Sequence, residues 1–329
     1  MPTSNDERSR SPLRDRPWLL PVAAGLSGAA LSGAALWWQE ARRAEALLQR
    51  FPPLGRFVAA RHPVHITDAG RGPPVLIIHG VGGSLYDFAA SPLPARLSRH
   101  RRVIMLDRPG YGHSRPGPPP SLDESAALFG AVLDACGVAA AHVVGHSFGA
   151  LLALGFSALS PERVTGLTLL NGLLRPGAPL VDVVAMSPRI PLLADIGGAT
   201  VSPPVARLTW PVLMGAMFEP CPVPPGYEGG AAYHLSLTPS AIATATAEVR
   251  AANRLTAEAA HLAPHVRAPI TVICGESDRV CPAFSQSIAF ATNRPGTRLI
   301  TVPGVGHMIH HAAADEIAMA VFASAAGRR

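Results

Sequence analysis

The sequence predicts an α/β fold in which a mostly parallel sheet is covered by helices on both faces and carries an inserted helical cap. Short, almost continuous apolar runs recur along the chain, as expected for strands that are buried on both faces. These runs occupy residues 75–78, 103–106, 142–144, 167–170, 270–273 and 299–302. Helical stretches such as 121–135 and 150–158 lie between most of them. A Pro-rich interval from Asn171 to about Pro269 is too long for an ordinary connection, and we interpret it as the cap.

The composition indicates one large folded domain and excludes several function classes. Nearly half of the 329 residues are hydrophobic, so the chain can bury a substantial core. The formal net charge is +6, but every basic residue is Arg and the chain contains no Lys. Schiff-base chemistry on a Lys and a Walker-type P-loop are therefore excluded. Because the Arg residues are dispersed along the chain, we expect no nucleic-acid partner.

The cysteines and histidines show no spacing typical of a metal site, so we expect neither a metal nor a cofactor. The four cysteines are Cys136, Cys221, Cys274 and Cys281. A disulfide between Cys274 and Cys281 is left open, because sequence separation cannot establish the geometry of the bond. The sequence does not specify an oligomeric state.

The first 55 residues differ in composition from the rest of the chain. Residues 1–16 are polar and mixed in charge, which predicts a disordered tail. No charged residue occurs from Trp18 to Trp38, a run of about the length that a bilayer-spanning helix needs, with Trp at both ends. We predict a transmembrane anchor at 17–38, which would make the membrane a partner, followed by a linker helix at 39–55. The alternatives are a signal peptide cleaved near Ala35 and a buried or surface helix, since Gly, Ser and Pro make the run only mildly apolar.

The globular domain is predicted to span residues 56–329. Short opening strands are expected at 57–60 and 64–67, before the series of buried strands begins. The cap insertion is predicted at about 173–268, with a helical patch at 181–186 and a longer helix at 240–260. In open α/β sheets, ligands bind at the carboxyl ends of the strands, so this cap would cover such a site.

The segment Gly145-His146-Ser147-Phe148-Gly149 matches G-x-S-x-G, the pattern of a nucleophile at a sharp strand-to-helix turn. An apolar run leads into it and a helical stretch follows, which is the context that the pattern requires. The two glycines suit a turn in which backbones approach closely. A helix that begins after Ser147 also favours negative charge developing nearby. Ser147 is therefore the candidate nucleophile.

A serine hydroxyl needs a base, and His307 is the candidate among the 13 histidines. It follows the last predicted strand, in a loop that can return the imidazole to the carboxyl edge of the sheet. His310 and His311 are rivals, although a closing helix is expected to begin there. His79 and His146 are interpreted as structural partners of neighbouring backbone.

An acid should hold the imidazole of the base in the correct tautomer, and Asp278 is the candidate. It lies in the loop after the apolar run that ends at Cys274, with Glu276 as a competitor in the same loop. The order along the chain is then Ser147, Asp278, His307, which is the order expected when the nucleophile lies in a G-x-S-x-G turn.

Negative charge that develops on a substrate carbonyl needs two backbone N–H donors. Phe148, which follows the nucleophile, is one candidate. Val81 is the other, because the Gly-rich loop at 79–83 follows a predicted strand and can fold close to Ser147. The loop lacks both the G-x-G-x-x-G spacing and the Lys of phosphate-binding loops.

Five strings in this order resemble the α/β-hydrolase superfamily, in its capped esterase, carbon–carbon hydrolase and haloperoxidase-like branch. The strings are PPVLIIHGVGGS, VIMLDRPGYGHS, VVGHSFGA, GESDRV and VPGVGHM. The resemblance runs from about Arg56 to the C-terminus. It implies an α/β-hydrolase fold, a catalytic triad of Ser147, Asp278 and His307, and an acyl-enzyme intermediate. The uncharged N-terminal run is also similar to that of bacterial membrane-associated members, which implies a single-pass location in the inner membrane, with the periplasmic side favoured for the hydrolase domain.

The expected activity is hydrolysis of an ester (acyl) bond in a small or medium apolar substrate, as in a carboxylesterase. A carbon–carbon bond hydrolase or a perhydrolase could use the same triad. A non-catalytic ligand-binding protein on the same fold is a further alternative, which the intact triad argues against. Relatives with dehalogenase or epoxide hydrolase activity use an Asp nucleophile, and this chain has Ser147 there.

Overall fold

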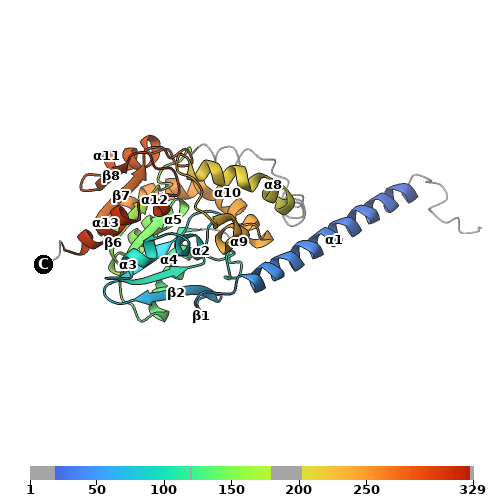
Figure 1. The fold of residues 1–329 in the computed structure, drawn as a ribbon, viewed down its shortest axis with the longest axis horizontal. Helices are drawn as coiled ribbons and strands as arrows, with labels where there is room; N and C mark the ends of the chain where they lie inside the picture. Colours follow the sequence, from blue (N-terminus) through green and yellow to red (C-terminus); the bar gives the residue numbers. More distant parts are fainter. Residues whose placement is uncertain (1–18, 119–120, 179–201, 327–329) are drawn as a thin grey trace, which may run out of the picture.

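The computed structural model describes residues 19–118, 121–178 and 202–326 (Figure 1). The tail predicted at 1–16 and the helical patch predicted at 181–186 lie outside these residues. The N-terminal helix α1 (Leu19–Arg50) is one continuous helix, where the sequence predicted an anchor and a separate linker helix. Figure 1 shows α1 extending away from the globular part of the molecule.

The prediction of a transmembrane anchor is wrong for the part of the chain that the structure describes. None of the helices there is both long enough and apolar enough to cross a membrane. The prediction used the uncharged run alone, whereas α1 continues without a break through Glu40, Arg42 and Arg43. Glu40 is buried and its carboxylate pairs with Arg207 of the cap, so the charged half of α1 packs against the globular domain. The predictions of a membrane partner and of a single-pass location in the inner membrane rested on this anchor and are wrong for the same reason.

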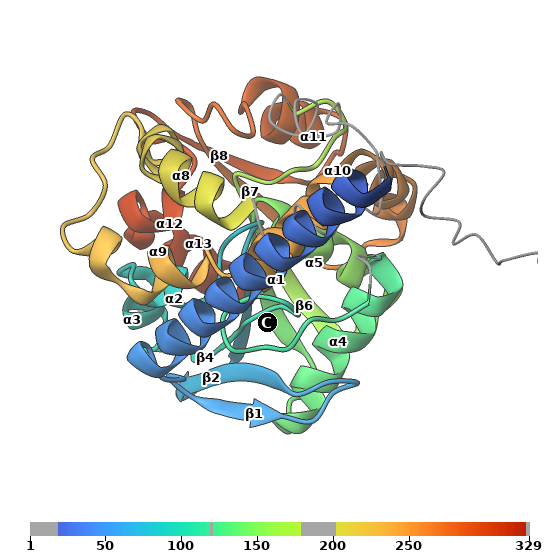
Figure 2. The same cartoon turned by 90° about the vertical axis from the view of Figure 1, so that its right-hand side faces the viewer.

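The second half of α1 packs on the globular domain. Leu47 and Leu48 contact the buried apolar cluster beneath the cap. The carboxylate of Glu40 accepts hydrogen bonds from both terminal nitrogens of Arg207, at 2.7 and 2.6 Å. Figure 2 shows α1 crossing in front of the domain in this view.

Eight strands form one sheet in the order β1-β2-β4-β3-β5-β6-β7-β8. They are β1 (Arg56–Val58), β2 (Val64–Gly70), β3 (Pro74–Ile78), β4 (Arg102–Leu106), β5 (Ala141–His146), β6 (Val164–Leu170), β7 (Ile270–Gly275) and β8 (Arg298–Val302). Strand β2 is antiparallel to both of its neighbours, and the six strands from β4 to β8 in this order are parallel. Their carboxyl ends therefore meet at one edge, where the site is found.

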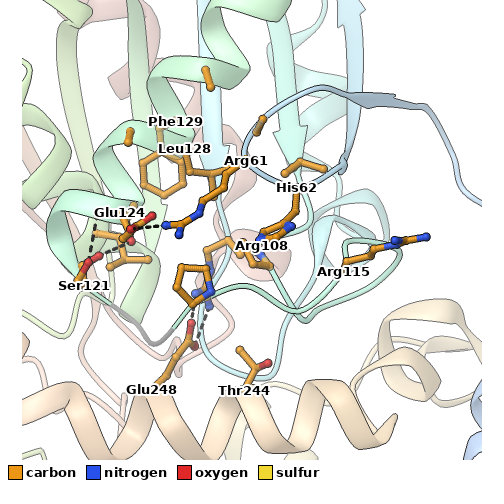
Figure 3. A pocket seen from close by; sticks show the side chains of 18 residues that line it. Arg61, His62, Arg108, Arg115, Ser121, Glu124, Leu128, Phe129, Thr244 and Glu248 are labelled. Atoms are coloured by element: carbon orange, nitrogen blue, oxygen red, sulfur yellow. Dashed lines mark hydrogen bonds and ion pairs between the residues drawn. The ribbon is translucent and has the colours of Figure 1, made fainter.

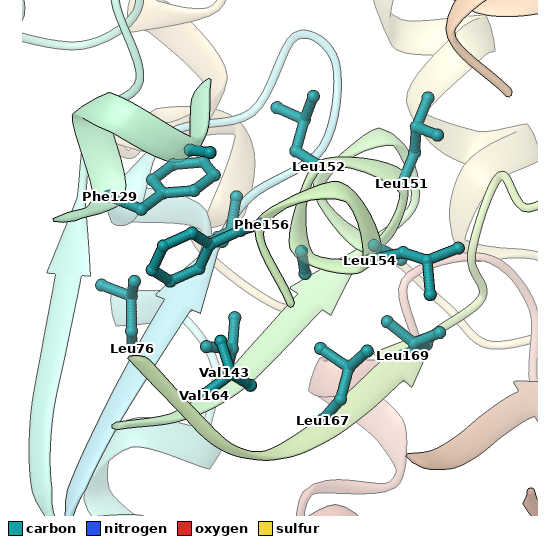
Figure 4. Close-up of a cluster of buried hydrophobic side chains, with 14 of the residues drawn as sticks. Leu76, Phe129, Val143, Leu151, Leu152, Leu154, Phe156, Val164, Leu167 and Leu169 are labelled. Carbon is teal, nitrogen blue, oxygen red and sulfur yellow. The ribbon is translucent and has the colours of Figure 1, made fainter. Parts of the chain in front are cut away.

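Helices cover both faces of the sheet because side chains alternate along each strand. On β3, Leu76 and Ile78 join one apolar cluster while Val75 and Ile77 join the other. The first cluster includes α4 (Leu122–Ala135) and α5 (Phe148–Leu159), and Figure 4 shows Phe129 and Phe156 from these helices packed together over the strands. The second cluster includes α2 (Leu85–Ala89), α3 (Leu93–Leu97) and the C-terminal α13 (Ala314–Ala326).

The cap lies between β6 and β7, where the long Pro-rich interval predicted an insertion. Its described elements are α8 (Ser202–Phe218), the short helix Tyr227–Gly229, α9 (Ala231–Leu235), α10 (Pro239–Leu262) and the short helix Ala263–His265. Thr238 begins α10 by accepting a hydrogen bond from the N–H of Ala241, and Pro239 occupies the first turn, where no N–H is needed. The remaining short helices of the described chain are Pro161–Arg163, Phe284–Ile288, α11 (Ala289–Thr292) and α12 (Ile309–Ala312).

Candidate active site

Ser147 occupies the sharp turn between β5 and α5. Its backbone has a φ of 55°, which is rare for a residue with a side chain. The N–H of Ser147 donates to the carbonyl oxygen of Leu170 at 2.9 Å, which ties the turn to the next strand. A Cβ on Gly145 would lie 2.7 Å from the Cα of Ala150, and one on Gly149 would overlap the carbonyl oxygen of Ile78. The two glycines of the motif therefore permit the turn that presents Ser147 at the carboxyl edge of the sheet.

His307 and Asp278 lie side by side at the same edge. Nδ1 of His307 is 2.8 Å from Oδ2 of Asp278, and both residues are buried. The other oxygen of Asp278 accepts hydrogen bonds from the N–H groups of Val280 and Cys281, at 2.8 and 2.9 Å. These donors hold the carboxylate in one orientation, so that Nε2 is the ring nitrogen of His307 left to receive a proton.

The competing residues point elsewhere. Glu276 is exposed, and its backbone N–H pairs with the carbonyl oxygen of Val302. His310 and His311 both contact the carboxylate of Asp87, at 3.1 and 3.3 Å. The structure therefore brings His307 and Asp278 together and leaves their sequence rivals in other environments.

Asn171 supports the histidine loop, a role that the sequence reasoning missed. Its side-chain nitrogen donates to the carbonyl oxygens of Gly306 and His307, both at 2.8 Å, and its side-chain oxygen accepts from the N–H of Gly275 at 2.8 Å. Asn171 also has a positive φ of 41°. The available signal was a polar residue directly after a buried strand, at the edge where ligands bind.

The loop at 79–83 lies against Ser147. A Cβ on Gly80 would be 3.0 Å from the Cβ of Ser147. Val81 follows Gly80 in this loop, and Phe148 is the first residue of α5. The next glycine, Gly82, has a φ of +69° and approaches the Trp210 ring of the cap. Both candidate oxyanion donors thus belong to backbone segments that flank Ser147.

The cap also contacts the histidine loop. The N–H groups of His307 and Met308 both donate to the carbonyl oxygen of Met217 in α8, at 3.1 and 3.3 Å. The ring of His146 contacts the same loop, since its Nε2 lies 2.9 Å from the carbonyl oxygen of His307. Burial, followed by the proximity of the His310 and His307 rings, holds the pKa of His146 well below its usual value, so this ring is neutral.

The thiol of Cys281 lies next to Ser147. Burial and the charge of Asp278 raise the pKa of Cys281 well above its usual value, while a hydrogen bond with the side chain of Ser147 acts in the opposite direction. Cys281 is therefore a neutral, buried neighbour of Ser147 rather than a thiolate. All four cysteines are free, so the pairing of Cys274 with Cys281 that the sequence left open is not formed.

Among the described residues, one group has side chains placed so that they could hold a metal ion: Asp87, His310 and His311. The atoms that would bind the ion lie within 4.8 Å of one another. The sequence separation between Asp87 and the two histidines concealed this cluster. The two histidines already contact the carboxylate, which also accepts a hydrogen bond from the hydroxyl of Tyr227 at 2.8 Å. These contacts, above all those with His310, lower the pKa of Asp87 well below its usual value although burial acts to raise it.

A mostly parallel sheet with a serine at a strand-to-helix turn, and a His–Asp pair at the same edge, define a protein of the α/β-hydrolase class. The family model described as alpha/beta hydrolase fold matches residues 73–314. The chain belongs to this family.

Individual relatives are similar over different lengths. The 2-hydroxy-6-oxo-6-phenylhexa-2,4-dienoate hydrolase of Burkholderia cepacia is 26% identical over 282 residues, which cover 82% of this chain and 94% of that protein. The pimeloyl-(acyl-carrier protein) methyl ester esterase of Methylococcus capsulatus is 39% identical over 125 residues, which cover 37% of this chain and 47% of the esterase. The crystal structure of the enol-lactonase from Burkholderia xenovorans LB400 has a TM-score of 0.65 at 21% identity and covers 82% of this chain and 99% of the lactonase. That structural likeness shows the fold alone.

The matches to several curated relatives are partial. The aligned stretches span 38%, 26% and 45% of the length of three of them. Membership of the family rests on the family model, which matches residues 73–314.

Proposed function

We propose that the protein is a serine hydrolase in which Ser147 is the nucleophile, His307 the general base and Asp278 the orienting acid. The observation that carries the proposal is the buried His307–Asp278 pair, with 2.8 Å between Nδ1 and Oδ2, at the sheet edge that also presents Ser147. A carboxylate on Nδ1 holds the imidazole in the tautomer whose Nε2 can accept the proton of a serine hydroxyl.

In the proposed mechanism, the Oγ of Ser147 attacks a carbonyl carbon of the substrate while Nε2 of His307 takes the hydroxyl proton. The backbone N–H groups of Phe148 and Val81 stabilise the negative charge on the former carbonyl oxygen. The tetrahedral intermediate collapses as His307 returns the proton to the leaving group, which leaves an acyl-enzyme. Water activated by the same histidine then releases the acid and regenerates Ser147.

The proposed substrate is a small or medium apolar ester. The cap contributes apolar side chains near this edge of the sheet. Trp210 approaches the loop at Gly82, and Met214 and Phe218 belong to the second apolar cluster. Apolar lining with a few fixed polar groups is the usual character of a small-molecule site. One relative is a pimeloyl-(acyl-carrier protein) methyl ester esterase, which supports this substrate class.

A carbon–carbon bond hydrolase is the second candidate. One relative that aligns over nearly its whole length, at 94%, is a 2-hydroxy-6-oxo-6-phenylhexa-2,4-dienoate hydrolase. The same three residues could serve a substrate in which a carbon–carbon bond next to a ketone is cleaved. Parallel assays with acyl esters and with a 2-hydroxy-6-oxo-dienoate distinguish the two, because only the second substrate loses its conjugated chromophore on cleavage.

Fluorophosphonate labelling tests the nucleophile. The protein should be labelled once, and Ser147→Ala should abolish both labelling and turnover, because the probe reacts with an activated serine hydroxyl. Ser160→Ala is a matched control, since Ser160 ends the same helix that begins after Ser147. Labelling of Ser147→Ala at the rate of the unmodified protein would reject the assignment.

A further inference from the structure

A buried ion pair joins the cap to the region of the nucleophile. Arg108 follows β4 and Glu248 lies on cap helix α10, and their side chains are only 3% and 5% exposed. Nη2 of Arg108 lies 3.0 Å from Oε2 of Glu248, and Nη1 contacts the other carboxylate oxygen. The hydroxyl of Tyr111 donates to the same carboxylate at 2.7 Å. Figure 3 shows Glu248 projecting from α10 toward Arg108, beside a cavity of about 200 Å³ that both residues line.

The same guanidinium holds the loop at 79–83. Nε of Arg108 donates to the carbonyl oxygen of His79 at 3.0 Å, and Nη2 donates to that of Gly80 at 2.8 Å. The backbone N–H of Arg108 donates to Nε2 of His79 at 2.9 Å, so Nδ1 of that ring carries the proton and donates to the Gly80 carbonyl at 2.8 Å. Burial, with the charge of Arg108, lowers the pKa of His79 well below its usual value, in agreement with a neutral ring.

These contacts determine where the N–H of Val81 points. Among the described residues, one peptide bond is cis, that between Glu219 and Pro220. The bond between Gly80 and Val81 is therefore trans. In a trans peptide the carbonyl and the N–H point in opposite directions. A carbonyl of Gly80 held by two side-chain donors therefore fixes the N–H of Val81 on the opposite side of the peptide, in a loop that lies against Ser147.

The ion pair depends on both partners because it is buried. Burial acts to lower the pKa of Arg108, but Glu248 and Tyr111 raise it overall, so the guanidinium stays charged. A buried charge that loses its partner is strongly unfavourable, and its surroundings then rearrange. Movement of α10 away from the sheet would therefore leave Arg108 without its carboxylate and the loop without a fixed support.

We propose that Arg108 is a positioning residue for the oxyanion hole, and that Glu248 makes this positioning depend on the docked cap. The inference rests on the proposed serine hydrolase function, in which the N–H of Val81 meets the developing oxyanion. Arg108 acts through the backbone of the loop, and the cap thereby contributes to the chemical step as well as covering the site.

Two variants test the proposal. Arg108→Met combined with Glu248→Gln removes both buried charges together, a change that folded proteins tolerate better than loss of one partner. Arg108→Lys keeps the charge but cannot span both carbonyls and the carboxylate, because its ammonium is a single compact group. We expect kcat to fall by about 10- to 100-fold in the double variant, less in Arg108→Lys, with KM changing much less, as for a donor displaced from its best position.

A pair of substrates reports on the oxyanion hole directly. An ester and its thiono analogue, in which sulfur replaces the carbonyl oxygen, differ at the atom that the N–H donors contact. The unmodified enzyme should strongly prefer the oxygen ester, and the preference should shrink in both variants because the donors no longer fit oxygen closely. Arg163→Gln is the matched control, since Arg163 also bonds a carboxylate, that of Asp134, and the backbone carbonyl of Ala139 in another part of the molecule.

The outcomes separate the inference from the function on which it rests. Retention of the full oxygen preference and of kcat in the double variant would overturn the role of Arg108, as would an equal loss of preference in Arg163→Gln. Failure of the unmodified protein to be labelled at Ser147, or to hydrolyse any ester, would instead reject the proposed function.

Discussion

At the scale of single residues, the environment of Asp278 explains why one of two neighbouring carboxylates reaches the histidine. Two consecutive backbone N–H groups bind Oδ1 of Asp278, which turns Oδ2 toward His307. Glu276 precedes this turn and remains exposed. The local backbone, and not the type of side chain, therefore decides which carboxylate reaches His307 and is the proposed acid.

This geometry predicts different effects for two conservative substitutions. Asp278→Asn should preserve folding and lower kcat by roughly 10⁴-fold, because an amide favours the wrong imidazole tautomer, whereas Glu276→Gln should lower it by less than about tenfold. Steady-state rates with one ester, and circular dichroism for folding, provide the measurement. A larger loss in Glu276→Gln than in Asp278→Asn would transfer the proposed acid role to Glu276.

At the scale of elements, α1 and the cap hold each other in place. Glu40 on α1 is 4% exposed and receives both terminal nitrogens of Arg207 on α8. Leu47 and Leu48 make hydrophobic contacts at the C-terminal end of α1 only. Among the described residues, the Glu40–Arg207 ion pair therefore links α1 to α8.

Arg207→Ala should release this part of α1, because it leaves the buried carboxylate of Glu40 without its partner. We expect hydrogen–deuterium exchange at amides 36–46 to speed up by at least about tenfold. The combination of Glu40→Gln with Arg207→Ala should have a smaller effect, since no charge is then left unpaired.

Arg279→Ala is the control for this experiment. Arg279 pairs with Glu219 on the surface, and both side chains are largely exposed. Exposed pairs contribute little to stability, so exchange in α1 should not change. Equal exchange of α1 in Arg207→Ala and in the unmodified protein would show that the apolar contacts alone hold the helix.

At the scale of the whole molecule, several buried histidines link stability to pH. Burial lowers the pKa of His79, His146 and His310, so these rings stay neutral in the folded protein. In the unfolded chain they titrate near the ordinary value of about 6.5. Below that pH the unfolded state binds more protons than the folded state, and the free energy of unfolding must fall as the pH falls.

Urea denaturation across a pH series should show this dependence. The free energy of unfolding should be nearly constant above about pH 7 and should decline below about 6.5, by up to about 1.4 kcal/mol per pH unit for each such histidine. His146→Asn, if folded, should make the decline less steep by about one proton. A free energy that stays level down to about pH 5 would contradict the neutral assignment of these rings.

Much of the fold could be predicted from local patterns. The six parallel strands were predicted to within a few residues, and five of them are buried, because the centre of a parallel sheet requires continuous apolar runs. The sixth, β8, lies at the edge of the sheet and is partly exposed, so the prediction that it is buried on both faces is wrong. The helix predicted at 240–260 is α10, and the turn at Ser147 follows from glycines whose missing Cβ atoms make room for backbone. The uncharged run near the N-terminus misled the prediction, since a lack of charge does not by itself make a helix long enough and apolar enough to cross a membrane, and none of the described helices is.

The sequence by itself determined the class of fold and the candidate residues Ser147, Asp278 and His307, because local periodicity and short motifs encode which strand ends they follow. Only the tertiary structure revealed the contacts between distant segments: Asn171 with the histidine loop, Glu40 with Arg207, and Glu248 with Arg108. Each of these contacts joins residues more than 100 positions apart. Such pairings depend on how the cap and helices settle on the sheet, and no local pattern records that packing.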